Sequence, residues 1–262
     1  MNRVTIYQVD AFSSELFSGN PAAVCPLKNW LSDELMQSIA KENNLSETAF
    51  FIPNGDKYDL RWFTPKTEIE LCGHATLATA HVLWSEMGFQ DRMIAFNTIH
   101  AGILEVSREK DILTMNFPSL EPKEADHDFA EEAAGLGARP SSFLACNYGM
   151  AIFESEQDII DIVPDLNLLK RSRYDGIIVT APGNSVDFVS RFFGPKLGIN
   201  EDPVTGGAHC ELIPYWAKRL NKRNMVARQL SSRGGELYCA YQGDRVLMGG
   251  KAVTYLRGEL LV

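Results

Sequence analysis

The stretch R-W-F-T-P-K-T-E-I at residues 61–69 matches R-F-F-G-P-K-L-G-I at residues 191–199, and five of the nine positions are identical. The offset between the two stretches is 130 residues (191 minus 61). After a three-residue insertion the match resumes, and C-G-H-A at 72–75 corresponds to T-G-G-A at 205–208. Each copy has the pattern of a strand, a loop, a glycine and the start of a helix. Two units of the same design in one chain indicate an internal duplication.

The segments around the two copies predict a protein that mixes short strands with a few helices. Apolar residues at helical spacing predict helices over 32–43 with Ser32 as the N-cap, 75–87, 156–163 and 208–221. Residues 119–128, S-L-E-P-K-E-A-D-H-D, have acid-rich, proline-containing turns without periodicity and are predicted to be a linker. We therefore expect an N-terminal domain over 1–120 and a C-terminal domain over 128–262, with the final strand able to return to the first domain.

The composition excludes several classes of protein. The chain has 262 residues, 45% of them hydrophobic, which is enough to bury a sizeable core. There are 25 Lys and Arg residues against 34 Asp and Glu residues, a formal charge of -9, and the basic residues are scattered, so nucleic acid is a poor partner. No apolar run approaches the length of about 18 residues that spans a bilayer, and the first residues lack a signal-peptide pattern. Five cysteines without metal-binding spacing fit reduced thiols, and we expect a cytoplasmic protein.

The two helix starts are candidate anion sites. A glycine before a helix lets a ligand approach free backbone N–H groups, where the helix dipole favours negative charge. Two such starts related by pseudo-twofold symmetry, at Gly73 and at Gly206-Gly207, are expected to face one cleft. A plainer interpretation is that these glycines only allow close packing of helix against sheet.

Chemistry in such a cleft needs an acid/base group, and Glu47 stands where a helix gives way to the apolar strand 48–52. Apolar neighbours could raise the pKa of this carboxyl toward the range of a general base. A solvated loop position is the alternative for Glu47, and a turn before Pro203 is the alternative for Asp202. His74 follows the first glycine, where the helix dipole favours a neutral ring, or it serves as a plain cap. His81 and His209 are expected to be structural.

Together, these segments resemble the PhzF-like (phenazine biosynthesis) isomerase family. Its motifs occur in order between Asp10 and His209: D-A-F, G-N-P-A-A-V, N-L-S-E-T-A-F, F-T-P-x-x-E-I-E-L-C-G-H-A-T and E-D-P-V-T-G-G-A-H. The resemblance implies an α+β protein of two pseudo-symmetric, diaminopimelate-epimerase-like domains. Each would be a curved, mostly antiparallel sheet or barrel around a central helix. It further implies a homodimer, a small carboxylate-bearing substrate, and no metal or cofactor.

By the same resemblance, Glu47 is the acid/base that moves a proton on the substrate, assisted by His74 and Asp202. Substrate-binding residues would be Asn20, Gly73, Gly206 and Gly207. The chain departs from the family pattern at Gly207, where the pattern has a serine. Because the serine hydroxyl is missing, the resemblance does not assign the substrate.

Two other functions remain open at this point. A two-base amino-acid epimerase would place a cysteine at each helix start; Cys72 occupies the first position, but Thr205 occupies the second. The other alternative is a non-catalytic protein that keeps the fold and binds a small molecule.

Overall fold

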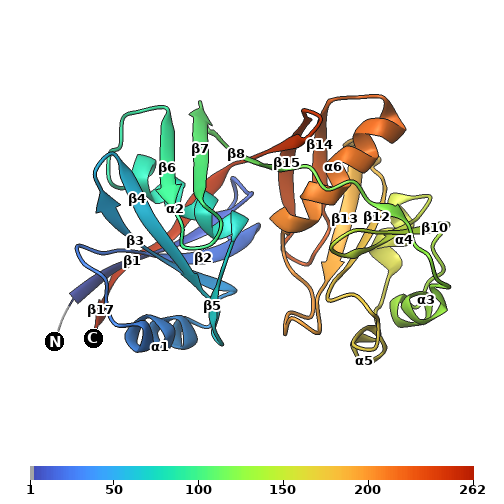
Figure 1. Cartoon of the computed structure of the whole chain (residues 1–262), viewed down its shortest axis with the longest axis horizontal. Helices are drawn as coiled ribbons and strands as arrows, with labels where there is room; N and C mark the ends of the chain where they lie inside the picture. Colours follow the sequence, from blue (N-terminus) through green and yellow to red (C-terminus); the bar gives the residue numbers. More distant parts are fainter. Residues whose placement is uncertain (1–2) are drawn as a thin grey trace. The chain divides into compact units, whose positions relative to one another are not determined.

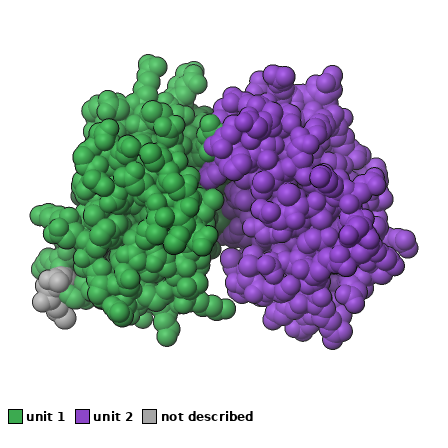
Figure 2. Space-filling model, viewed as in Figure 1, with its two compact units in different colours: residues 1–116, 249–262 green, residues 117–248 purple. Residues whose placement is uncertain are grey.

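The computed structural model describes residues 3–262 and divides the chain into two compact units. Unit 1 comprises Met1–Asn116 with Gly249–Val262, and unit 2 comprises Phe117–Met248 (Figure 2). The segment 119–128, predicted as a linker, lies inside unit 2 and contains a short strand. The chain's last strand belongs to unit 1, because it pairs along the first strand of the chain over most of its length.

The sheet of unit 1 pairs its strands in the order β17, β1, β2, β3, β4, β6, β7 and β8 (Figure 1). Two helices, α1 (Asp33–Asn43) and α2 (Gly73–Ser85), complete the unit. The strands are β1 (Arg3–Ala11), β2 (Asn20–Pro26), β3 (Glu47–Asn54), β4 (Lys57–Phe63), β5 (Glu68–Ile69), β6 (Met93–Asn97), β7 (Ile103–Glu109), β8 (Ile112–Pro118) and β17 (Ala252–Leu261).

The sheet of unit 2 pairs its strands in the order β9, β10, β11, β12, β13, β14 and β15. The strands are β9 (Lys123–Glu124), β10 (Ser142–Ala145), β11 (Gly149–Ile152), β12 (Ile177–Pro182), β13 (Phe188–Phe193), β14 (Asn224–Gln229), β15 (Gly235–Tyr241) and β16 (Arg245–Gly250). The helices are α3 (Ala130–Leu136), α4 (Glu156–Asp161), α5 (Leu166–Leu169) and α6 (Gly206–Leu220).

The two units repeat one pairing scheme, as the duplication in the sequence predicts. From β1 to β7 the pairings run antiparallel, parallel, antiparallel, parallel and antiparallel, and the same series runs from β10 to β15. In each unit a helix lies in each parallel crossover, and α2 corresponds to α6. The α+β class is confirmed, with open sheets rather than closed barrels among the described strands.

A half-buried ion pair is also duplicated. The guanidinium of Arg61 donates to both carboxylate oxygens of Glu68 at 2.7 Å, and that of Arg191 donates to both oxygens of Glu201 at 2.7 and 3.1 Å. The two arginines are 130 residues apart, whereas the two glutamates are 133 apart (201 minus 68), as are the two helix starts. The three extra residues of the second copy therefore lie between the arginine and the glutamate of its ion pair. The two ion pairs hold equivalent strand ends in the two units.

Local signals account for the helix ends. Ser32 caps α1 by accepting a hydrogen bond from the backbone N–H of Leu35, as predicted. Helix α2 ends at Ser85 rather than at residue 87, because the N–H of Phe89 bonds the carbonyl of Leu83 around Gly88, whose φ is 75°. Within residues 3–262, no helix has both the length and the apolar content that a membrane crossing requires.

Candidate functional site

Glu47 is the first residue of β3 and is buried. The chain reaches it from α1 through Asn44, whose left-handed φ of 49° ends the helix. The parallel register places Glu47 beside Ala22 of β2. Only 6% of its surface is exposed, so the structure does not support the alternative of a solvated loop residue.

His74 and Cys72 meet Glu47 at the start of α2. Cys72 is the N-cap residue, and helix α2 begins at Gly73. The His74 Nε2 lies 3.0 Å from the Glu47 Oε2, and the His74 Nδ1 lies 3.5 Å from the Cys72 Sγ. Although Nε2 and Oε2 are close, neither forms an aligned hydrogen bond with a described residue. The two buried atoms therefore face each other as an ion pair rather than as an aligned hydrogen bond.

The electrostatic surroundings favour a charged His74 more than the sequence alone suggested. Burial by itself lowers the pKa of His74, but the adjacent Glu47 carboxylate raises it, so that the pKa lies above its ordinary value. The expectation of a neutral ring considered only the helix dipole, which is outweighed by a carboxylate at 3.0 Å. Burial raises the pKa of the Cys72 thiol, which disfavours the thiolate.

Among residues 3–262, these three side chains also form the cluster whose spacing could hold a metal ion, because their candidate ligand atoms all lie within 4.8 Å of one another. A histidine ligates an ion through one ring nitrogen, while the second nitrogen usually donates to another group. Here Nδ1 faces the thiol and Nε2 faces the carboxylate, so the ring stands between them. The polar contacts of His74 with Glu47 on one side and with Cys72 on the other are therefore enough to explain why the three side chains lie together.

Asn20 is the first residue of β2 and is fully buried. Residues two apart on a strand point to the same face of the sheet, so Asn20 and Ala22 share a face. Because Ala22 is paired with Glu47, Asn20 lies on the strand next to the candidate acid/base. Asn20, Gly73 and His74 thus lie near Glu47 in unit 1.

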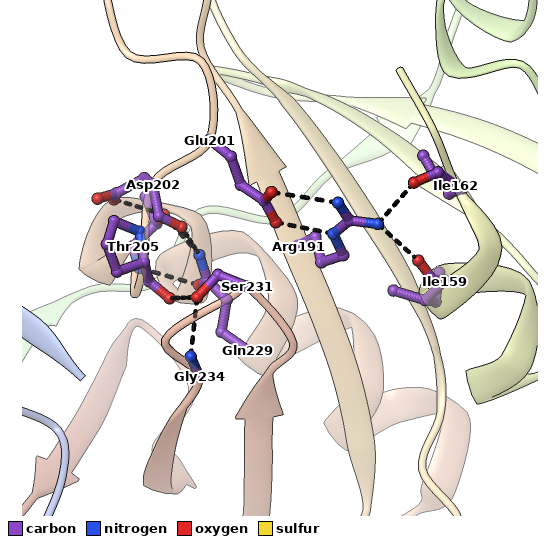
Figure 3. Close-up of polar contacts among 10 residues, drawn as sticks. Ile159, Ile162, Arg191, Glu201, Asp202, Thr205, Gln229, Ser231 and Gly234 are labelled. Atoms are coloured by element: carbon purple, nitrogen blue, oxygen red, sulfur yellow. Dashed lines mark hydrogen bonds and ion pairs between the residues drawn. The ribbon is translucent and has the colours of Figure 1, made fainter. Parts of the chain in front are cut away.

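The other predicted site residues, Asp202, Gly206 and Gly207, belong to unit 2. Asp202 is 9% exposed, and its Oδ2 accepts a hydrogen bond of 2.6 Å from the Thr205 hydroxyl (Figure 3). Helix α6 begins at Gly206, directly after Thr205. A Cβ atom on Gly207 would lie 3.3 Å from the hydroxyl oxygen of Tyr148, so a side chain there would require this hydroxyl to shift by a few tenths of an ångström.

His209 and His81 have structural surroundings. Burial lowers the pKa of His209 to about 4, and its Nδ1 lies 2.8 Å from the carbonyl oxygen of Thr205. Burial also lowers the pKa of His81 to about 4, and its Nε2 contacts the Thr254 hydroxyl at 3.1 Å. These lowered pKa values favour neutral rings, and the local contacts of both rings are of the kind that a structural role requires.

Three buried or half-buried residues of unit 2 were not found from the sequence. Gln229 ends β14 and binds both Asp202 and Thr205. A signal existed for Gln229, because it continues the buried face that alternates through Met225 and Ala227. Glu211 and Tyr148 show no such signal, because the hydrogen bond that joins them links residues 63 apart in the sequence.

Comparisons with known proteins give a consistent result over nearly the whole chain. The sequence model of the PhzC-PhzF family, described as phenazine biosynthesis-like protein, matches residues 9–258. An uncharacterized isomerase of Pseudomonas aeruginosa is 48% identical over 259 residues, covering 98% of this chain and 98% of that protein. A phenazine biosynthesis-like domain-containing protein of the mouse is 37% identical over 288 residues, covering 98% of this chain and 99% of the mouse protein.

Solved structures agree on the fold. A PhzF-family phenazine biosynthesis protein of Enterococcus faecalis matches with a TM-score of 0.97 and 45% identity, covering 100% of both chains. A hydroxyproline epimerase of Agrobacterium vitis matches with a TM-score of 0.64 at 12% identity, covering 99% of this chain and 91% of that one. The second likeness shows the fold alone.

Proposed function

Because the chain belongs to the PhzC-PhzF, phenazine biosynthesis-like family, we propose that it is an isomerase that uses Glu47 as its acid/base. In this proposal Glu47 takes a proton from one carbon of a small carboxylate-bearing substrate and returns it elsewhere on the same molecule. Relatives that cover 98–100% of this chain support the isomerase class. The proton transfer, the role of Glu47 and the substrate class are our proposal.

The observation that carries the proposal is the buried contact between a carboxylate and an imidazole, Glu47 and His74, at the start of α2. The Glu47 Oε2 and the His74 Nε2 lie 3.0 Å apart with no aligned hydrogen bond to a described residue. Burying two ionisable side chains is costly, and pairs of this kind are concentrated at functional sites. A carboxylate and an imidazole in this state are equipped to exchange a proton with a bound molecule.

The chemistry divides between these two side chains. As Glu47 removes a proton from carbon, its carboxylate becomes neutral and negative charge develops on the substrate. A protonated His74 beside it stabilises that charge, and the free N–H groups at the start of α2, near Gly73, add to this stabilisation. When Glu47 returns the proton to a different carbon, its carboxylate is ionised again and the substrate loses the added negative charge, while His74 stays protonated throughout.

Asp202, Gly206 and Gly207 enter the proposal as assisting groups from the second copy of the repeat. Asp202 would orient the substrate, and the backbone at Gly206 and Gly207 would bind a carboxylate. We expect Asp202→Asn to weaken substrate turnover while leaving the melting temperature near that of the wild type.

The test is solvent-deuterium uptake. The protein is incubated in heavy water with a panel of small unsaturated and amino carboxylic acids, and deuterium at carbon is measured by mass spectrometry and NMR. We expect Glu47→Gln to lower uptake by about 100- to 10,000-fold, the usual contribution of a general acid/base. Glu42→Gln is the matched control, because Glu42 is an exposed glutamate on α1.

Equal uptake by the wild type and the Glu47→Gln variant would refute the proposal. Uptake lost equally in both glutamine variants would point to a general effect of charge or stability.

The epimerase alternative is supported by one contact, that of Cys72 with His74. It lacks a second thiol, because Thr205 occupies the equivalent position. We expect Cys72→Ala to keep most of the turnover. A loss as large as that of Glu47→Gln, together with inversion at the α-carbon of an amino acid, would favour the epimerase instead.

The non-catalytic alternative predicts tight binding of a carboxylate without deuterium uptake, and the same experiment detects it. The homodimer also remains a prediction, which sedimentation velocity of the purified protein tests.

A further inference from the structure

Trp62, in the core of unit 1, has an indole N–H without a hydrogen-bond acceptor. The residue lies on β4, only 2% of its surface is exposed, and its Nε1 finds no partner among residues 3–262. A buried donor without an acceptor costs folding free energy, and most buried donors in proteins are hydrogen-bonded. The unpaired indole donor therefore needs an explanation other than packing.

The strand register brings Trp62 within reach of Glu47. Antiparallel pairing sets Trp62 opposite Ala49 of β3, and Glu47 is two residues before Ala49 on the same strand. The three side chains therefore point to one face of the sheet. Diagonal neighbours of this kind lie about 7–8 Å apart, a distance that an aromatic side chain can span. On its other side Trp62 pairs with Ile69, three residues before the Cys72 N-cap of α2.

The second copy of the repeat shows the two equivalent positions in direct competition for space. The offset of 130 residues makes Phe192 the counterpart of Trp62. The strand partner of Phe192 is Ile178, so Gly176, two residues earlier, is the counterpart of Glu47. A Cβ atom on Gly176 would clash with the ring of Phe192. The aromatic residue of this pair therefore reaches the position at which unit 1 carries its acid/base.

The two copies also indicate that packing does not require the indole nitrogen. Trp62 and Phe192 are each 2% exposed, and in both copies an arginine precedes them and a phenylalanine follows. A phenyl ring is thus sufficient at this position of the repeat in unit 2, where glycine stands in place of Glu47. The indole N–H occurs in the unit that carries the carboxylate.

We propose that Trp62 is a substrate-binding residue whose indole N–H donates a hydrogen bond to an oxygen of the substrate beside Glu47. The placement of the indole concerns unit 1 alone, and the substrate contact rests on the proposed function. An indole nitrogen only donates, so the group that it binds must be an acceptor. Because the substrate carboxylate is assigned to the backbone at Gly206 and Gly207, this acceptor is a second oxygen-bearing group. The substrate class narrows to acids that also carry a keto, hydroxyl or further carboxyl group.

The first test compares 2-oxobutanoate with 2-methylidenebutanoate, two carboxylates of similar shape in which a methylene group replaces the keto oxygen. Binding of each acid to the full chain is measured by calorimetry. We expect the wild type to bind the keto acid about 10-fold more tightly, because the methylene group leaves a buried donor unpaired. Trp62→Phe should bind the two acids to within about threefold of each other.

A sulfur analogue of tryptophan separates the N–H from the shape of the ring. With 3-benzothienylalanine at position 62 the bicyclic ring is kept and the donor is removed. This protein should lose the preference for the keto acid as Trp62→Phe does. It should melt no lower than the wild type, because the indole N–H makes no hydrogen bond with the described residues.

Trp84→Phe is the matched control. The Trp84 Nε1 already donates to the backbone carbonyl oxygen of Asp91, at 2.8 Å. We expect the variant to lower the melting temperature by about 2–4 °C, since it loses that hydrogen bond. Its preference for the keto acid should match that of the wild type.

A second readout follows the donor itself. The chain has four tryptophans, so labelling them with nitrogen-15 gives four indole N–H signals in an NMR spectrum. The phenylalanine variants assign the signals of Trp62 and Trp84. Adding 2-oxobutanoate should move the Trp62 proton signal downfield, as a new hydrogen bond does, and leave the Trp84 signal in place. Adding 2-methylidenebutanoate should not move the Trp62 signal downfield.

The proposal is overturned if the wild type binds the two acids equally or binds neither, if the sulfur analogue keeps the preference, or if the Trp62 signal ignores the keto acid. A preference and a shifted Trp62 signal without Glu47-dependent deuterium uptake would sink the proposed function and support the role of Trp62. Glu47-dependent uptake with no preference for the keto acid would do the reverse.

Discussion

Replacing Glu211 by glutamine is expected to make the protein more stable at alkaline pH and to change little at acid pH. Glu211 lies on α6 and has no exposed surface. Its Oε1 accepts the backbone N–H groups of Asn147 and Tyr148, each at 3.1 Å, and its Oε2 has no hydrogen-bond partner among the described residues. Burial raises the pKa of Glu211 from 4.5 to about 7, although the two N–H groups lower it.

The magnitude follows from the difference between the folded and unfolded states. With an ordinary pKa of 4.5 in the unfolded chain and about 7 in the fold, the folded protein binds this proton more tightly. Stability from this group is fully present below pH 4.5 and is lost as the pH rises to about 7. A separation of about 2.5 in pKa corresponds to about 3 kcal/mol, an upper figure since a solvent-relaxed site recovers part of it.

The assay is urea unfolding at several values between pH 4.5 and 8.5. Glutamine keeps the accepting oxygen and removes the ionisation, so the wild type should lose about 1–3 kcal/mol relative to Glu211→Gln as the pH rises. Glu42→Gln, at an exposed position, should run parallel to the wild type. Parallel curves for the wild type and Glu211→Gln would show that Glu211 ionises freely and would refute the reasoning.

Three further changes test the fold and the start of α6. Gly19→Ala is expected to cost more than about 2 kcal/mol in urea unfolding, because Gly19 has φ 68° and a Cβ there would clash with the carbonyl oxygen of Ala11; a loss under 0.5 kcal/mol contradicts this. Ser32→Ala should cost about 1 kcal/mol by the same assay through the lost N-cap of α1, and Ser32→Asp should restore it. Gly207→Ser should lower the free energy of unfolding by about 1 kcal/mol in the wild type, and by less in a Tyr148→Phe background, where the hydroxyl is absent. Thermal unfolding of the four proteins of this double-mutant cycle measures the difference. Equal costs in both backgrounds would exclude a clash with the hydroxyl.

Much of the fold was accessible from the sequence because its signals are local or repeated. The cap at Ser32 and the apolar stripe that follows it specify α1 without reference to the rest of the chain. The repeat at 61–69 and 191–199 identified two units of one design, since duplication leaves the same strand and helix pattern twice. The same pattern predicted helices from residues 75 and 208, two residues after the observed starts at Gly73 and Gly206.

What could not be predicted depends on contacts between distant segments. No local pattern tells that Glu211 accepts hydrogen bonds from a turn more than 60 residues earlier in the chain. The charge of His74 was misjudged for the same reason, because the helix dipole is visible in the sequence whereas the 3.0 Å contact with Glu47 is not. The contacts of Gln229 required three dimensions as well.

The duplicated ion pairs, Arg61 with Glu68 and Arg191 with Glu201, hold the same frame in both copies of the repeat, while the residues beside them differ. The residue after the glutamate is Ile69 in one copy and Asp202 in the other, although the same arginine–glutamate ion pair precedes it in both. Because the ion pair fixes the backbone in each copy, the position after the glutamate can carry a different side chain without a change in the surrounding fold. Grafting residues 202–205 into the first copy, behind an intact Arg61–Glu68 pair, would accordingly be the natural starting point for redesigning this scaffold.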